Sequence, residues 1–288
     1  MNNYYASEVN ADSIKVANEN YPNIIQLGDI ECLIKINEEG NIVKTGKKLK
    51  DLPKIDLLLG GSPCQGISRS KTEGRLNLKD PRSRLFFNYI AIRDWLIENN
   101  NPKLKFLLEN VKPSIDTLNI MNDVIGTQPY IINSSYFSAQ DRLRLYWTNF
   151  TVNLDDIKDK NIYIKDILDN SHDEKINSLK DIKYIDSVVW GNNYVKWDTG
   201  GKGYYSQQNR ARYLNKKINT LPKSNSGDKT RIYLGEYKYR NASVLELERC
   251  QTLPDEYTNC INSKPKRRGI IGDGWTVDVI VHILQHLK

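Results

Sequence analysis

The stretch "LLLGGSPCQGIS" at residues 57–68 places a cysteine shortly after an apolar run. The three leucines predict a buried strand, and the glycine pair that follows allows the backbone to turn sharply. Pro63 then stiffens the approach to Cys64. A cysteine on such a turn suits a nucleophile, because a loop-borne thiolate can reach a substrate. A buried structural cysteine in a strand–helix turn is the alternative interpretation.

Strand-like and helical patterns alternate over the first half of the chain. Strands are expected at 2–9, 23–30, 54–61, 105–111, 130–138 and 142–150, and helices at 10–22, 83–100 and 120–126. This alternation predicts an α/β domain with a mostly parallel sheet. Ligands of such a sheet bind at the carboxyl ends of its strands. Glu8, Asp29, Cys64 and Glu109 each follow or end a predicted strand, so we expect them to converge at one edge.

The pattern becomes looser in the second half of the chain. Residues 151–239 are polar and rich in Gly, Asn, Lys and Tyr, which predicts a small, loop-rich lobe. Regular structure returns over 240–288, where Ser243 and Glu246 have the spacing of a helix capping box. The last helix is expected to carry its apolar face on Val277, Ile280, Val281 and Leu284.

The basic residues are unevenly distributed in this chain of 288 residues and net charge +7. Between Lys196 and Arg240, eleven Lys and Arg residues accompany three acidic ones. A basic segment on a nearly neutral body predicts a binding surface for a polyanion. A solvated, lysine-rich loop is the alternative.

Several other classes of protein are disfavoured. The apolar runs are too short to span a membrane, and the chain begins with polar residues rather than a signal peptide, so we expect a soluble, cytoplasmic protein. The cysteines at 32, 64, 250 and 260 form no CxxC pair and no zinc-like cluster with histidine, so no metal site is predicted.

Two further segments carry candidate catalytic side chains. Glu109 ends the predicted strand "KFLLENV", where a carboxyl group partly removed from water can donate a proton near neutral pH. An ion pair with a basic residue at the sheet edge is the alternative for Glu109. Arg142 and Arg144 alternate along a strand-like segment and therefore face the same side, which suits phosphate or carbonyl recognition.

Taken together, these segments resemble a known enzyme family. "PCQ" at 63–65, "ENV" at 109–111 and Gln140-x-Arg142-x-Arg144 resemble, in order, the signature blocks of DNA cytosine-5 methyltransferases. The segments at 4–22, 27–30, 240–257 and 272–284 are similar to four further blocks of that family. The resemblance covers nearly the whole chain and is closest in style to the de novo-type branch and its phage and bacterial relatives.

The resemblance implies a fold, a cofactor and a substrate. The fold would be the Rossmann-like fold of S-adenosylmethionine-dependent methyltransferases, with a mostly parallel sheet and a small target-recognition lobe. Residues 1–150 would form the catalytic domain, 151–239 the target-recognition region, and 240–288 a segment that returns to the catalytic domain. The partner would be double-stranded DNA, from which the target cytosine is flipped, in a restriction–modification or phage-protection system. The polar, basic stretch at 68–80 would be a loop that closes over the DNA.

The resemblance also implies individual roles. The catalytic residues would be Cys64, Glu109, Arg142 and Arg144. Those binding S-adenosyl-L-methionine would be Glu8, Val9, Asp29, Ile30, Pro63, Asp273, Gly274 and Trp275. Those binding the substrate would be Gln65, Ser68, Asn110, Gln140 and Arg240.

The sequence departs from the family pattern at its start. The family opens with a strand and a glycine-rich turn around the methionine part of the cofactor, whereas Met1 lies seven residues before Glu8. We therefore expect this chain to lack that strand and turn. A mis-assigned start or fragment, a partner chain that supplies the unit, and a catalytically inactive DNA-binding remnant are the three explanations. A tRNA cytosine-5 methyltransferase is a further alternative, because the same catalytic residues would serve it.

Overall fold

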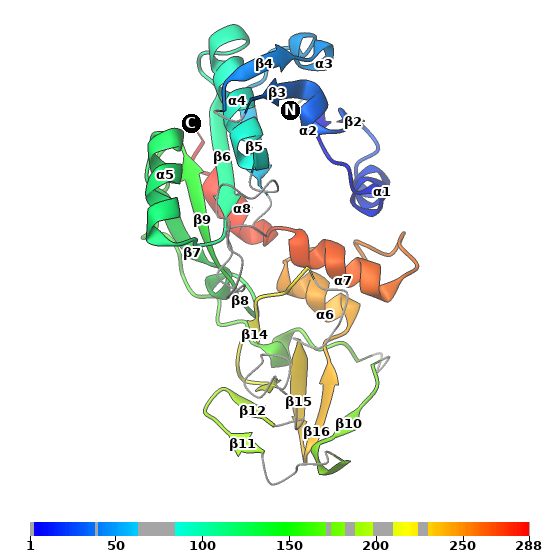
Figure 1. Cartoon of the computed structure of the whole chain (residues 1–288). Coiled ribbons are helices and arrows are strands. Elements are labelled where there is room, and N and C mark those ends of the chain that lie inside the picture. Colours follow the sequence, from blue (N-terminus) through cyan, green and yellow to red (C-terminus); the bar gives the residue numbers. More distant parts are fainter. Residues whose placement is uncertain are drawn as a thin grey trace. The chain divides into compact units, whose positions relative to one another are not determined.

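The computed structural model describes residues 3–37, 40–62, 84–170, 174–181, 188–197, 210–223 and 230–287. The chain folds into two compact units, each assembled from separated segments (Figure 1). Unit 1 comprises Met1–Ile132, Leu143–Val152 and His286–Lys288. Unit 2 comprises Asn133–Arg142 and Asn153–Gln285.

Unit 1 alternates strands with helices, as the sequence pattern predicts. Its strands are β1 (Tyr4–Ala6), β2 (Ile24–Gln26), β3 (Ile34–Ile36), β4 (Ile42–Thr45), β5 (Leu57–Gly61), β6 (Lys105–Asn110), β7 (Tyr130–Asn133, which ends at the unit boundary) and β9 (Leu143–Thr148). Its helices are α1 (Ala11–Asn20), α2 (Ile30–Leu33), α3 (Lys47–Lys50), α4 (Arg84–Asn99) and α5 (Ile115–Ile125).

The strands of unit 1 form three small sheets. β1 pairs with β2 in parallel, and β3 pairs with β4 antiparallel. The third sheet has the order β5-β6-β9-β7, in which β5 and β6 are parallel and β9 runs antiparallel to β6. The predicted α/β class is confirmed, and the parallel pairs are divided between two sheets. Among the described residues, no strand joins β1 to β5.

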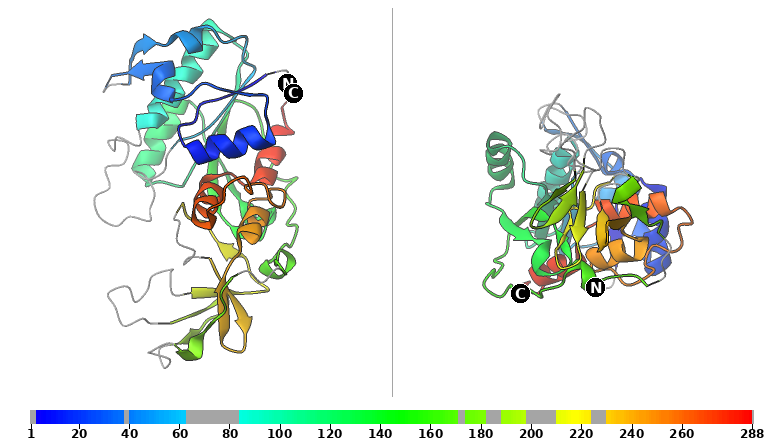
Figure 2. Two further views of the ribbon diagram at one scale, coloured as in Figure 1. Left: turned by 90° about the vertical axis from the view of Figure 1, so that its right-hand side faces the viewer. Right: turned by 90° about the horizontal axis from the view of Figure 1, so that it is seen from below.

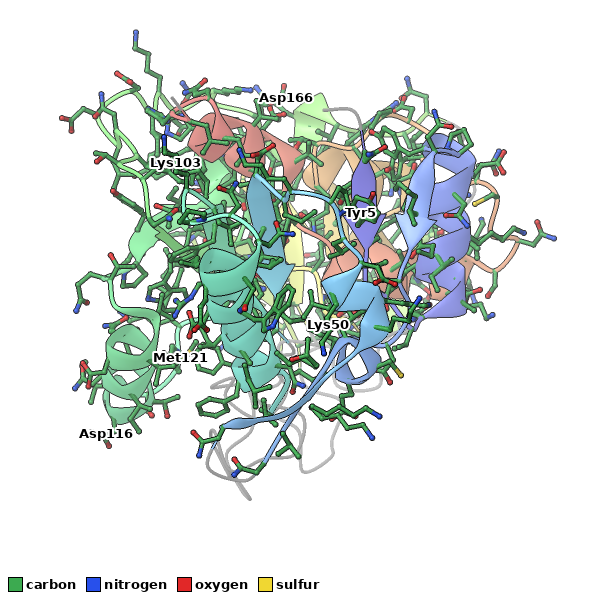
Figure 3. All side chains as sticks on the ribbon, turned by 90° about the horizontal axis from the view of Figure 1, so that it is seen from above. Tyr5, Lys50, Lys103, Asp116, Met121 and Asp166 are labelled. Carbon is green, nitrogen blue, oxygen red and sulfur yellow. The ribbon has the colours of Figure 1, made fainter. Side chains whose placement is uncertain are left out.

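The long helix α4 connects two apolar clusters in unit 1. Its residues Phe86, Tyr89 and Ile90 share one cluster with residues of the sheet and of α5. The partners are Phe106, Leu108, Leu145 and Trp147 of the sheet and Met121 of α5, which is labelled in Figure 3. Its residues Ala91, Ile92 and Leu96 share the other with Ile34 and Ile36 of β3. The helix therefore buries residues on more than one side, and it supports the sheet that carries the candidate site.

Unit 2 contains more regular structure than the expected loop-rich lobe. A six-stranded sheet has the order β10-β16-β15-β13-β12-β11, and its β15–β16 hairpin is visible in yellow and orange in Figure 2. The strands are β10 (Asn177–Ser178), β11 (Val189–Trp190), β12 (Tyr194–Lys196), β13 (Arg210–Tyr213), β15 (Arg231–Gly235) and β16 (Lys238–Asn241). A separate parallel pair joins β8 (Gln140–Asp141) and β14 (Ile218–Asn219).

The helical part of unit 2 lies mainly at its C-terminal end. The helices are α6 (Val244–Cys250), α7 (Lys264–Asp273) and α8 (Val277–Leu284), with 3-10 turns at Ser134–Tyr136, Ile164–Asp166 and Leu179–Asp181. The predicted capping box at the start of α6 is confirmed: the Glu246 amide donates to Ser243 Oγ, and the Ser243 amide donates to the Glu246 carboxylate.

The predicted apolar face of α8 is wrong in part. Of the predicted residues, Ile280 is buried and Leu284 is half-buried, but Val277 and Val281 are exposed. The other buried positions are Val279, His282 and Ile283. The helix is apolar at nearly every position, so its periodicity discriminates poorly between faces. The polar residue His282 points inward because its Nε2 lies 3.2 Å from the Asn153 carbonyl oxygen and its ring packs against Phe137.

Gly60 on β5 offers a test of the packing between this sheet and α4. A Cβ at position 60 would overlap the ring of Tyr89, which is buried and donates a hydrogen bond from its hydroxyl to the Leu107 carbonyl oxygen at 3.1 Å. We expect Gly60→Ala to lower the free energy of unfolding by about 1–3 kcal/mol, because the ring has no free space. Urea unfolding measures this change.

The matched control is Gly274→Ala. A Cβ there would lie 3.4 Å from the Ile271 carbonyl oxygen, which is ordinary contact, and the free energy of unfolding should change little. Equal stability of the two variants would contradict the close packing described for Gly60.

Candidate active site

The ends of β1 and β2 bring two predicted cofactor residues to one edge of unit 1. The strands are parallel neighbours, and Glu8 and Asp29 follow them. Ser7 Oγ donates to the Gly28 carbonyl oxygen at 2.7 Å, which ties the two strand ends together. Asp29 is exposed, and Glu8 is half-buried. The sequence reasoning missed Ser7, for which adjacency to Glu8 was the available signal.

Local hydrogen bonds orient both carboxylates. Glu8 Oε1 accepts from the amides of Val9 and Asn10 at 2.7 and 2.8 Å. Asp29 caps α2, and its Oδ1 accepts from the Glu31 amide at 2.9 Å. Carboxylates oriented in this way accept hydrogen bonds from hydroxyl or amino groups. They therefore fit the ribose hydroxyls and adenine amine of S-adenosylmethionine, beside the exposed Val9 and the half-buried Ile30.

The strand β5 leads into the segment that carries the candidate nucleophile. Gly61 at its end is the register partner of Glu109 on β6. The Asn110 side-chain amide donates to Ser62 Oγ at 2.8 Å and lies 3.4 Å from the Ser62 carbonyl oxygen. Asn110 is 1% exposed, so this contact fixes the residue that precedes position 63. Ser62 was not predicted as a site residue, although it adjoins the "PCQ" motif.

Four predicted site residues lie outside the described residues. They are Pro63, Cys64, Gln65 and Ser68, and the predicted closing loop at 68–80 lies there too. The cysteines that the structure describes behave differently from one another: Cys250 is buried, Cys260 is half-buried and Cys32 is exposed. Burial raises the pKa of the Cys250 thiol, which keeps it protonated and unreactive.

Glu109 and Arg144 form an ion pair in unit 1. Arg144 Nε lies 3.0 Å from Glu109 Oε1, and their side chains are only 12% and 11% exposed. Glu109 is on β6 and Arg144 is on the antiparallel neighbour β9, so the sheet register brings the two side chains together. Arg144 Nη1 also donates to the Leu143 carbonyl oxygen at 2.8 Å. The pair joins a candidate proton donor to a candidate substrate-binding cation.

Arg142 has different surroundings from Arg144. It belongs to unit 2, is 4% exposed, and donates to the carbonyl oxygens of Leu221, Gly272 and Gly274 at 3.0 to 3.4 Å. These contacts use its guanidinium to join backbone segments. The contact between Arg142 and the cytosine stays a prediction.

Gln140 and Arg240 also have partners inside unit 2. Gln140 is fully buried and donates to the Cys250 carbonyl oxygen and to Gln251 Oε1 at 3.2 and 3.0 Å. Arg240 makes a bidentate ion pair with Glu246, in which Nη1 donates to Oε2 at 2.8 Å and Nη2 donates to Oε1 at 2.6 Å. Both side chains therefore contribute to the fold of unit 2, and their contact with the substrate stays a prediction.

The three predicted cofactor residues near the C-terminus lie where α7 ends. Asp273 pairs with Lys223 at 2.5 Å. The Gly274 carbonyl oxygen accepts from Gln251 Nε2 at 3.0 Å as well as from Arg142, and Trp275 is half-buried. Gln251 lies in the family-like segment 240–257, but no role in this turn was predicted for it from the sequence.

The sequence and fold match known proteins. The family model for C-5 cytosine-specific DNA methylase matches residues 1–288. The chain belongs to the C-5 cytosine-specific DNA methylase family. The suspected resemblance and the Rossmann-like methyltransferase fold are thereby confirmed.

The relatives include phage and bacterial proteins. The orphan methyltransferase M.SPRI of Bacillus phage SPR is 38% identical over 118 residues, which cover 37% of this chain and 25% of that protein. The type II methyltransferase M.FnuDI of Fusobacterium nucleatum is 27% identical over 278 residues, which cover 83% of this chain and 78% of that protein. The match therefore spans about a quarter of the phage protein but most of the bacterial one.

Two solved structures share the fold. The Entamoeba histolytica methyltransferase EhMeth matches with a TM-score of 0.59 and 13% identity, covering 99% of this chain and 90% of that chain. The Dnmt2 methyltransferase of S. pombe matches with a TM-score of 0.54 and 15% identity, covering 100% of both chains. In the part of this chain that the structure describes, no helix is long and apolar enough to cross a membrane. The same described residues hold no cluster of His, Cys, Asp and Glu that could bind a metal.

The Glu109–Arg144 pair can be tested by its effect on stability. We expect Arg144→Ala to lower the free energy of unfolding by about 3 kcal/mol, because it leaves a buried carboxylate without its cation. Adding Glu109→Ala should recover part of that loss, since no charge then remains to be compensated. A double-mutant cycle measured by urea unfolding gives the coupling.

The exposed pair between Lys47 and Asp51 serves as a control. Its atoms lie 3.1 Å apart with side chains 89% and 58% exposed, so Lys47→Ala should change stability by well under about 1 kcal/mol. Additive effects of the Arg144 and Glu109 substitutions would show that the two side chains act independently.

Proposed function

We propose that this chain is the catalytic polypeptide of a DNA cytosine-5 methyltransferase, which transfers a methyl group to C5 of a flipped cytosine in duplex DNA. The observation that carries the proposal is the buried pair of Glu109 and Arg144 at the end of β6, one residue from the Asn110 contact that holds Ser62. These side chains belong to the family's signature segments. Glu109 is the register partner of Gly61, and Asn110 contacts Ser62, so both lie beside residues that come directly before Pro63 and Cys64 in the chain.

The proposed reaction begins with the nucleophile. The Cys64 thiolate adds to C6 of cytosine while Glu109 gives a proton to N3, and the product is an enamine that is nucleophilic at C5. C5 then takes the methyl group, which S-adenosylmethionine supplies when it is bound. Water takes the C5 proton, the N3 proton returns to Glu109, and the Cys64 thiolate leaves, which restores the aromatic ring.

Arg144 has two roles in this proposal. Its contact with Glu109 Oε1 holds the carboxyl group of Glu109 in one orientation. It also supplies a cation beside the site, and we propose that this cation meets the O2 carbonyl oxygen of the cytosine or the adjacent phosphate. Asn110, which fixes Ser62, positions the nucleophile segment.

Glu8 and Asp29 form half of the proposed cofactor site. They would accept hydrogen bonds from the ribose hydroxyls and the adenine amine, with Val9 and Ile30 beside the adenine. The support is that amides orient both carboxylates at adjacent strand ends, where Asp29 is exposed and Glu8 is half-buried. Pro63, Asp273, Gly274 and Trp275 remain proposed members of this site.

We also propose that a further strand and glycine-rich turn, supplied by a second chain, complete the cofactor site. Among the described strands, β1 pairs only with β2, and β5 pairs only with β6. Each of the two strands thus presents an edge that can accept a partner, and such edges commonly pair with another chain.

The remaining assignments concern recognition of the DNA and the place where the protein acts. We propose that residues 151–239 recognise the DNA target, that 240–288 returns to the catalytic domain, and that 68–80 closes over the DNA together with Gln65 and Ser68. The protein would act in the cytoplasm of a bacterium or of a phage-infected cell, since its relatives are named as phage and bacterial methyltransferases.

The cofactor proposal predicts weak binding by the chain alone. We expect calorimetry to detect little affinity of residues 1–288 for S-adenosylmethionine. An N-terminal fusion that supplies such a strand and glycine-rich turn should bind at least about tenfold more tightly, a gain of about 1.4 kcal/mol. Tight binding by the unfused chain would contradict the incomplete site.

The catalytic proposal predicts a covalent adduct through one thiol. In the presence of S-adenosylmethionine, the fused protein should form a stable adduct with a duplex containing 5-fluorocytosine, because fluorine at C5 cannot leave as a proton does. Cys64→Ser should abolish the adduct, whereas Cys32→Ser, which removes an exposed thiol elsewhere, should retain it. Mass spectrometry detects the adduct.

Bisulfite sequencing of DNA from expressing cells provides the second readout. Methylation at C5 should appear with the wild-type fusion and disappear with Cys64→Ser. Salt-sensitive DNA binding without any adduct or methylation would instead identify a non-catalytic DNA-binding protein. An adduct formed with a fluorinated tRNA but not with the duplex would identify RNA, rather than DNA, as the substrate.

A further inference from the structure

The six-stranded sheet of unit 2 has two chemically different faces. Val195 and Ala211 are register partners on neighbouring strands, and both are fully buried in a cluster with Trp197 and Leu179. Side chains alternate between the faces along a strand, so residues adjacent to these two point to the opposite side. We call the side of Val195 and Ala211 the packed face and the other side the basic face.

Three cations and a tyrosine gather on the basic face at β12 and β13. Lys196 is the register partner of Arg210, and Tyr194 is the register partner of Arg212. The guanidinium carbons of Arg210 and Arg212 lie 4.8 and 5.4 Å from the centre of the Tyr194 ring. All four side chains are half-buried, because the ring and the cations cover one another.

The environments of the two arginines differ. Arg212 donates from Nε to Asn219 Oδ1 at 3.0 Å, and its Nη2 contacts the same oxygen. The Asp141 carboxylate is a nearby opposite charge for Arg212. Arg210 stacks on Tyr194, and among the described residues it makes no ion pair. Within the part of the chain that the structure describes, the charge of Arg210 is thus less compensated than that of Arg212.

This arrangement costs stability within the protein. Like charges on directly opposed residues repel each other, and Lys196 faces Arg210 across the strand pair. Stacking on Tyr194 recovers part of the cost through cation–π attraction and fixes the direction of both guanidiniums. A cluster of oriented cations is favourable when a polyanion neutralises it.

The packed face provides an internal comparison. Arg231 is the register partner of Ala211, and its guanidinium carbon lies 5.4 Å from the centre of the Trp197 ring and 5.7 Å from that of Tyr239. These aromatic residues belong to the apolar cluster of that face. Arg231 therefore has the same side chain and the same kind of stacking as Arg210, but it lies on the opposite side of the sheet.

We propose that the basic face, through Arg210 with Arg212, Tyr194 and Lys196, binds the phosphate backbone of the duplex DNA substrate. This inference rests on the proposed function and names the surface of unit 2 that carries out part of it. Guanidinium groups suit phosphate oxygens, since they present several donors in a plane. The face would position the duplex without reading its sequence.

The test is the salt dependence of duplex binding by the full chain. We expect Arg210→Gln to reduce the slope of log affinity against log salt by about one and to weaken binding uniformly across sequences, because one phosphate contact is lost. Arg210→Lys retains the charge and should keep most of the slope. Arg231→Gln is the matched control and should leave the slope unchanged. Thermal unfolding of each variant identifies any loss of fold.

Each outcome decides between the proposals. A wild-type chain that binds no duplex would overturn the proposed function itself. If the wild-type chain binds with a steep salt slope and Arg210→Gln has the same slope, this assignment is overturned and the enzyme proposal stays intact. The same holds if only Arg231→Gln lowers the slope. If the wild-type chain and Arg210→Lys bound tRNA more tightly than the duplex, the face would belong to an RNA site and the DNA assignment would be wrong.

Discussion

The candidate active site in unit 1 depends on the ion pair between Glu109 and Arg144. Both side chains are mostly removed from water, and a buried charge is tolerated when an opposite charge and hydrogen bonds compensate it. The strand register makes the pair possible, since β6 lies between β5 and the antiparallel β9. From the same strand end, Asn110 reaches Ser62 at the end of β5. The same end of the sheet therefore orients Glu109, Arg144 and Ser62, the last residue before Pro63 and Cys64.

The family's signature residues in unit 2 have a different physical purpose. Gln140, Arg142 and Arg240 are nearly or fully buried, and their polar groups meet backbone carbonyls or an internal carboxylate. An unsatisfied polar group at these positions would be costly, so the surrounding backbone is arranged to provide partners. In this chain, these three signature residues thus help to hold unit 2 together. A motif alone does not separate a structural purpose from a chemical one.

Local signals in the sequence predicted local structure well. Ser243 and Glu246 form their capping box because its geometry involves four consecutive residues only. Glu8 and Asp29 meet at one edge because the ends of parallel neighbouring strands necessarily lie together. The six-stranded sheet was missed, since its strands are two to five residues long and their alternation is hidden by stacked arginines, lysines and tyrosines. The apolar face of α8 was misplaced because His282 finds an inward partner that lies far away in the sequence.

The sequence by itself determined the α/β class, the family and the identity of the residues that carry the proposed chemistry, because these follow from short patterns in a fixed order. Only the tertiary structure decided what each of those residues contacts. Arg142 and Arg144 look equivalent in the sequence, two positions apart on one face of a strand-like segment. Arg144 meets Glu109, whereas Arg142 meets carbonyl groups 79 to 132 residues away. The partner of a side chain depends on what the whole chain packs against it, and that long-range packing is absent from any local pattern.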